Sequence, residues 1–101
     1  MAAPASRKGR AGEFLVAHML QLAGAEVHHV HSDFDLIVVT PRRKLVSVEV
    51  KTAFERRKAS PKSYQFNVRH AVCDFYVFLA ADIQRLIVRR GADVRCGQQA
   101  Y

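Results

Sequence analysis

The sequence predicts a single α/β domain in which one N-terminal helix packs on a mixed sheet of four to five strands, with a central hairpin and a short second helix. Apolar residues recur at helical spacing between Gly9 and Gly24, and the chain then alternates between apolar strand patterns and turn signals. Half of its 101 residues are apolar, which is enough for one compact core. Tandem domains are therefore excluded.

The predicted helix spans Gly9 to Gly24, where the second glycine is a typical stop signal. Residues 1–8 are predicted to form a flexible basic arm, 9–95 the domain and 96–101 a tail. Glu13 falls in the first turn, where the helix dipole favours a carboxylate, and this alone could account for it. The apolar stripe expected to face the sheet, with His18 as a packed core histidine, consists of Phe14, Leu15, His18, Met19 and Leu22, extended by Val16, Ala17 and Leu20.

Strand patterns follow the helix. Phe34–Val39 (FDLIVV) is apolar on both faces apart from Asp35, which predicts a central strand covered on two sides. Leu45–Ala53 (LVSVEVKTA) is predicted to pair with it in a hairpin. The other expected elements are strands at Glu26–Val30, Tyr64–Val68 and Phe75–Ala80, an edge strand at Arg85–Arg90, a charged loop at Phe54–Ser63 and a short helix between Val68 and Asp74.

The hairpin loop determines how the charged residues of its two strands face each other. With a loop of three residues, Thr40 faces Lys44, and pairing backwards sets Asp35 opposite Glu49. Both acids then leave the same face of the sheet with Cβ atoms about 4.5–5.5 Å apart. Lys51 is the next side chain on that face. A loop of even length would place the two acids on opposite faces.

Two opposed carboxylates in an apolar sheet repel each other and need compensating positive charge. Lys51 supplies one positive charge for the two negative charges of Asp35 and Glu49. A divalent cation supplies two, and oxygen ligands with open positions suit Mg²⁺ or Mn²⁺. A purely structural Asp–Lys–Glu ion cluster at the sheet edge is the alternative.

These residues resemble the motif of the PD-(D/E)xK superfamily of restriction-endonuclease-like nucleases. The order is Glu13 in a first helix, Asp35 in a strand, and Glu49-Val50-Lys51 in the next strand. "RKGRAGEFLVAHMLQLAGAEV" is similar to the helix opening of archaeal-type Holliday junction resolvases and of related restriction and homing endonuclease domains. "FDLIVV", "VSVEVKTA" and "YQFNV…CDFYVFLA" resemble the core strands, so the likeness covers residues 8 to 80. Two departures are Phe34 where proline is common, and the short segment where the family has a longer second helix.

The resemblance implies a restriction-endonuclease-like core and a catalytic set of Glu13, Asp35, Glu49 and Lys51. It implies that Asp35, Glu49 and the main-chain carbonyl of Val50 hold a catalytic Mg²⁺, for which Mn²⁺ substitutes. Lys51 would position or deprotonate the attacking water, and Glu13 would act as ligand of a second ion or through a water.

The composition favours a polyanionic partner. Lys and Arg number 16 against 9 Asp and Glu, which gives a net charge of +7 and a pI near 10.0. A generically basic protein or a membrane-surface binder is the alternative, but no basic amphipathic helix is evident. The residues predicted to contact DNA are Arg7, Lys8, Arg10, Arg42, Arg43, Lys44, Arg56, Arg57, Lys58, Lys62, Gln65 and Arg69.

Together these observations predict a metal-dependent DNA endonuclease, with selectivity for branched DNA and a homodimer or higher homo-oligomer as further expectations. The alternative is a non-catalytic nucleic-acid-binding protein of the same fold, or a nuclease subunit of a larger complex. With neither a signal peptide nor a spanning segment evident, a cytoplasmic location without membrane association is expected. Cys73 and Cys96 are expected to be reduced thiols, and the histidines at 28, 29 and 31 lack the arrangement of a zinc site.

Overall fold

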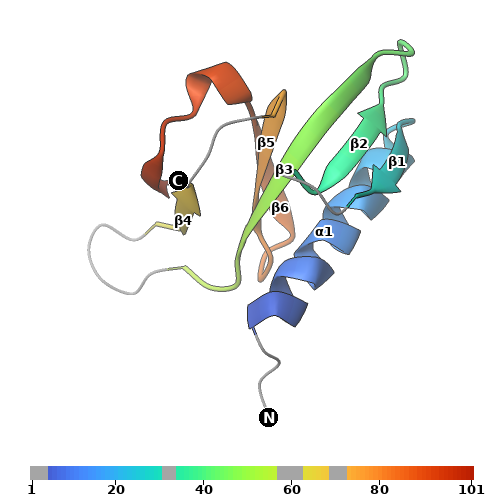
Figure 1. The fold of residues 1–101 in the computed structure, drawn as a ribbon. Coiled ribbons are helices and arrows are strands. Elements are labelled where there is room, and N and C mark those ends of the chain that lie inside the picture. The colour runs from blue at the N-terminus through green and yellow to red at the C-terminus, as the bar shows by residue number, and fades with distance from the viewer. Residues whose placement is uncertain (1–4, 31–33, 57–62, 69–72) are drawn as a thin grey trace.

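A five-stranded mixed sheet forms the centre of the fold, with a helix on one face and a two-stranded sheet on the other (Figure 1). The computed structural model describes residues 5–30, 34–56, 63–68 and 73–101. The elements are α1 (Ala5–Leu22), β1 (Glu26–His29), β2 (Leu36–Val39), β3 (Leu45–Ala53), β4 (Gln65–Val68), β5 (Phe75–Ala80), β6 (Arg85–Arg90), the 3₁₀ helix η1 (Gly91–Asp93) and β7 (Gly97–Ala100). This arrangement confirms the predicted fold class.

The large sheet has the order β1-β2-β3-β5-β6, so β3 is its central strand. β3 runs antiparallel to β2 and parallel to β5, and all other neighbouring strands of this sheet are antiparallel. The alternation predicted for β3 is correct, because Val48 and Val50 are buried whereas Glu49 and Lys51 on the opposite face are partly exposed. β6 lies at the sheet edge, as predicted.

Two apolar clusters occupy the two faces of this sheet. Beneath α1, Val16 of the helix packs with Leu36, Val48 and neighbouring valines of the sheet. On the other face, Phe66 of β4 packs against Phe78 of β5, with ring centroids 5.0 Å apart. Both faces of the large sheet are therefore covered by apolar packing.

The helix differs from the prediction in its start and in its buried face. It begins at Ala5, so the residues assigned to a flexible arm include its first turn. Phe14 is 55% exposed, Leu22 is 76% exposed and His18 is exposed, so His18 is not a core histidine. The prediction is correct for Val16 and Ala17, which are buried, and for Leu15 and Leu20, which pack against the core cluster beneath the helix. Gly12, four residues before Val16 on the same side of the helix, is also buried.

The predictions for β2 and β4 also need correction. β2 begins at Leu36, so Phe34 and Asp35 precede it, and Ile37 and Val39 are only partly buried. β4 lies outside the large sheet and pairs with β7, whose residues 97–100 were assigned to a tail. The second helix predicted between Val68 and Asp74 falls largely on residues 69–72, outside the described residues.

In the described part of the chain, no helix is long and apolar enough to cross a bilayer. Cys73 and Cys96 form no disulfide with each other.

Candidate functional site

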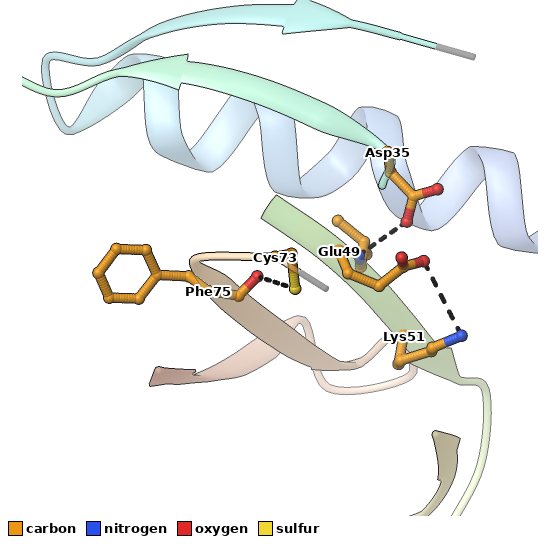
Figure 2. Close-up of polar contacts among 6 residues, drawn as sticks. Asp35, Glu49, Lys51, Cys73 and Phe75 are labelled. Atoms are coloured by element: carbon orange, nitrogen blue, oxygen red, sulfur yellow. Dashed lines mark hydrogen bonds and ion pairs between the residues drawn. The ribbon is translucent and has the colours of Figure 1, made fainter. Parts of the chain in front are cut away.

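The candidate site lies beside the last part of β3, beyond the point where β2 begins, so that β3 has β5 on one side and no strand of the described residues on the other. β2 pairs with β3 only from Leu45 to Val48, whereas β3 extends to Ala53. On the β2 side, no described strand pairs with this last part of β3. Asp35 occupies the start of the free edge, because its N–H donates to the Val48 carbonyl at 3.0 Å and its Oδ2 accepts from the Val50 N–H at 2.8 Å (Figure 2). A carboxylate oxygen thus accepts the hydrogen bond that a strand carbonyl would otherwise accept from the Val50 N–H.

The hairpin has the predicted register. The Thr40 N–H donates to the Lys44 carbonyl at 2.8 Å, and the loop residue Arg43 takes a φ of 66°. This is a three-residue loop with its last residue in the left-handed region. The strand pairing ends with Leu36 opposite Val48, so Asp35 precedes the paired residues, and its side chain lines the same cavity as that of Glu49.

All four residues predicted to be catalytic line one cavity of about 390 Å³. Glu13 comes from α1, Asp35 precedes β2, and Glu49 and Lys51 project from β3. Among them, Lys51 Nζ lies 3.9 Å from Glu49 Oε1 (Figure 2). The Glu49 and Lys51 side chains are 16% and 30% exposed, so this is a partly desolvated cluster.

Burial and the proximity of Asp35 disfavour the charged forms of Glu49 and Glu13. Burial, hydrogen bonding to Asp35 and the charge of Asp35 raise the pKa of Glu49 to about 7, although Lys51 acts in the opposite direction. Burial and the nearby Asp35 likewise raise the pKa of Glu13 to about 7, and Arg10 opposes this. The protein has gathered more negative charge here than its own cations neutralise.

This donor set fits a hard divalent cation. Carboxylate oxygens and a main-chain carbonyl are the ligands that Mg²⁺ prefers in proteins. Because the N–H and C=O of a strand residue point to the same side, the Val50 carbonyl faces the free edge where its N–H meets Asp35. Within the described residues, no group of three or more His, Cys, Asp or Glu side chains could hold a metal ion. An ion at this place would therefore need the Val50 carbonyl as a ligand in addition to Asp35 and Glu49.

Thiol or phenol chemistry is disfavoured beside Glu49. Burial, together with the charge of Glu49, raises the pKa of Cys73, whose Sγ–H donates to the Phe75 carbonyl at 3.4 Å (Figure 2). Burial raises the pKa of Tyr76 to about 12. Both groups therefore stay protonated at neutral pH and supply no nucleophile.

The predicted DNA-contacting residues do not all surround the cavity. Lys8 lines it, and Arg7, Arg10 and Arg56 are exposed on segments that adjoin it. The basic hairpin residues at 42–44 lie at the opposite end of β3. Gln65 lies in the second sheet, where its amide donates to Ser63 Oγ at 2.8 Å, and is not among the residues that line the cavity. Arg57, Lys58, Lys62 and Arg69 lie outside the described residues.

Sequence reasoning missed Phe54 as a residue of this cavity and gave Lys8 only a general DNA contact. No periodicity marks Phe54, since it follows the last residue of β3. The spacing of Lys8, Gly12 and Val16 on one side of the helix was the available signal for Lys8.

Comparison with solved structures finds a bacterial homing endonuclease, I-Ssp6803I, with a TM-score of 0.82 and 17% sequence identity, covering 99% of this chain and 76% of that one. No family model matches the sequence, and no curated protein gives a significant match. At this identity the likeness shows a shared fold.

Proposed function

We propose that the protein is a divalent-metal-dependent DNA endonuclease that hydrolyses phosphodiester bonds. The single observation that supports this most strongly is the convergence of Glu13, Asp35, Glu49 and Lys51 in one cavity beside the free edge of β3. The net charge of +7 favours a nucleic acid as partner, and the fold is similar to that of a bacterial homing endonuclease.

The four charged residues predicted to be catalytic and the Val50 carbonyl each have a role in this proposal. Asp35, Glu49 and the Val50 carbonyl hold Mg²⁺ or Mn²⁺, which when bound polarises the scissile phosphate and lowers the pKa of a coordinated water. The Lys51 ammonium hydrogen-bonds the attacking water and offsets charge that develops on the phosphoryl oxygens. Glu13 acts from the helix, either on a second ion or through a water.

A cleavage assay tests the catalytic assignment. Wild-type protein is expected to nick supercoiled plasmid or cut a four-way junction with Mg²⁺ or Mn²⁺, and EDTA is expected to stop it. Lys51→Ala should lower kcat about 10²–10³-fold, because it removes a charge aimed at the reacting phosphate, and leave DNA affinity nearly unchanged. Arg95→Ala is the matched control, since it removes an exposed cation that neither lines the cavity nor belongs to the predicted DNA-contacting residues.

Equal cleavage by wild type and Lys51→Ala would reject the catalytic role. Binding to DNA without cleavage under any metal condition would instead favour the non-catalytic alternative, or a subunit that needs a larger complex.

The proposal extends to branched DNA and to a homodimer, since cutting both strands of a symmetric target needs two active sites. The edge strand β6 is a poor surface for self-pairing. The antiparallel register that pairs all six residues of two β6 strands sets Arg85 opposite Arg90, and opposed like charges are destabilising. A dimer should therefore use another surface, and Val88→Lys on β6 should leave its mass in solution unchanged.

A further inference from the structure

Two side chains at the rim of the cavity form a contact that the proposed chemistry does not use. Lys8 in the first turns of α1 places its Nζ 5.4 Å from the centroid of the Phe54 ring. Both residues line the cavity that holds Glu13, Glu49 and Lys51. A cation above an aromatic face at this distance is attracted to it, but at an exposed site the contact is weak and easily exchanged.

Packing does not explain the position of Phe54. Phe54 is 38% exposed, whereas the core ring of Phe78 is 1% exposed. Phe54 belongs to neither of the two apolar clusters formed by the described residues. An aromatic face is thus presented at the rim of a cavity whose interior is acidic.

The close approach of α1 to β3 brings the two residues together. A Cβ on Gly12 would lie 2.1 Å from Thr52 Oγ1, so glycine allows the helix to touch the end of β3. Lys8 lies one helical turn before Gly12 on the same side, and Phe54 follows Thr52 by two residues. The Thr52 hydroxyl is buried and has no hydrogen-bond partner among the described residues, which fits a contact set by steric closeness.

We propose that Lys8 and Phe54 are substrate-positioning residues that select DNA with an unpaired nucleotide beside the scissile phosphate. Lys8 leaves the ring to bind a backbone phosphate, and the freed face of Phe54 stacks on the unpaired base. Aromatic stacking of this kind tolerates every base, because each has a π-face. A base inside a paired duplex is already stacked and cannot use the ring. The inference rests on the proposed function, because it concerns the substrate of the same cavity.

The test measures binding without cleavage, in EDTA, to a single-stranded oligonucleotide and to the same sequence as a duplex. Phe54→Ala is expected to weaken single-strand binding about tenfold and duplex binding less than about twofold, because only the single strand offers a free base. Phe54→Tyr should stay close to wild type, since it keeps the ring. Lys8→Ala should weaken both DNAs and reduce the dependence of affinity on salt.

Leu45→Ala is the matched control, because Leu45 is 69% exposed at the other end of β3 and its loss should affect neither DNA. Melting curves show whether each variant is folded. Equal losses on both DNAs for Phe54→Ala, or no loss on either, would overturn the inference. Since no cleavage is needed, this result is independent of the Lys51 experiment: selective binding without any metal-dependent cutting would retain the positioning pair and reject the nuclease.

Discussion

Replacing Glu49 by Gln should stabilise the metal-free protein at alkaline pH, although the same change should abolish cleavage. Glu49 has a pKa of about 7 in the folded state, because burial and Asp35 disfavour its charged form. Its folded-state pKa is raised above the unfolded value. The carboxyl group therefore favours folding at a pH below the unfolded pKa, and this contribution is lost as the pH rises through about 7.

The size of the effect follows from the two pKa values. A folded pKa of about 7 against about 4.3 in the unfolded chain corresponds at most to about 3–4 kcal/mol at pH 8. The cavity is open to solvent and salt screens its charges, so about 1–2 kcal/mol is the realistic penalty. In a domain of this length that amount corresponds to a rise in Tm of about 5–10 °C for Glu49→Gln.

Thermal unfolding in EDTA at pH 8 and at pH 4.5 measures this difference. Glu49→Gln should melt above wild type at pH 8, and the gap should shrink toward zero at pH 4.5. Glu55→Gln is the control for the change in net charge, because Glu55 is exposed just beyond β3. Saturating Mn²⁺ should reverse the order, since an ion at 100 times its Kd stabilises wild type by about 2.7 kcal/mol. A Glu49→Gln variant that melts below wild type at pH 8 in EDTA would refute the argument that burial and Asp35 make the charged form of Glu49 unfavourable.

Three further changes test the scaffold. Gly12→Ala should lower the free energy of unfolding, measured by urea titration, by about 1–3 kcal/mol, because its methyl group would collide with the Thr52 hydroxyl of β3. Gly9→Ala is the control, because a methyl group there meets open space and should be neutral or stabilising in the same titration. Arg43→Gly should raise stability by about 1 kcal/mol by removing a side chain held at φ 66°, while DNA affinity falls with the lost charge. Ser47→Ala should cost about 1 kcal/mol, because Ser47 Oγ accepts from the Asp74 N–H at 2.9 Å and donates to its carboxylate at 3.2 Å; an unchanged urea midpoint would contradict this.

The register of the acids could be predicted because it depends on one local property, the number of residues in the hairpin loop. Thr40 and Lys44 close a loop of odd length, and every pairing before them follows from the period of two. The face of α1 could not be predicted in this way. Apolar side chains occur almost all around this helix, from Phe14 through Leu20, so their spacing does not single out one side. The buried side is chosen instead by the close approach at Gly12, which is a tertiary contact.

The second sheet was missed for a related reason. β7 has the sequence Gly-Gln-Gln-Ala, which has no apolar alternation, and three of its four residues are exposed. It is a strand because β4 supplies its hydrogen-bonding partner. The strand at β4 was predicted because buried Phe66 and Val68 alternate with more polar residues. Such a pattern shows which face of a strand is buried, but it does not show which strand pairs with it.

The start of β2 at Leu36 explains why the same residues lower stability and serve the proposed activity. If β2 began before Leu36, its backbone would form hydrogen bonds with the edge of β3, and the N–H and C=O of Val50 would be used within the sheet. Because β2 begins only at Leu36, a side-chain oxygen of Asp35 accepts from the Val50 N–H. The Val50 carbonyl is left facing the cavity. The free edge thus draws a carboxylate next to Glu49 and exposes a further oxygen beside them. This surplus of oxygen ligands is unfavourable in the empty protein and favourable once a cation binds, so the side chains that destabilise the metal-free fold should be the ones that cleavage requires.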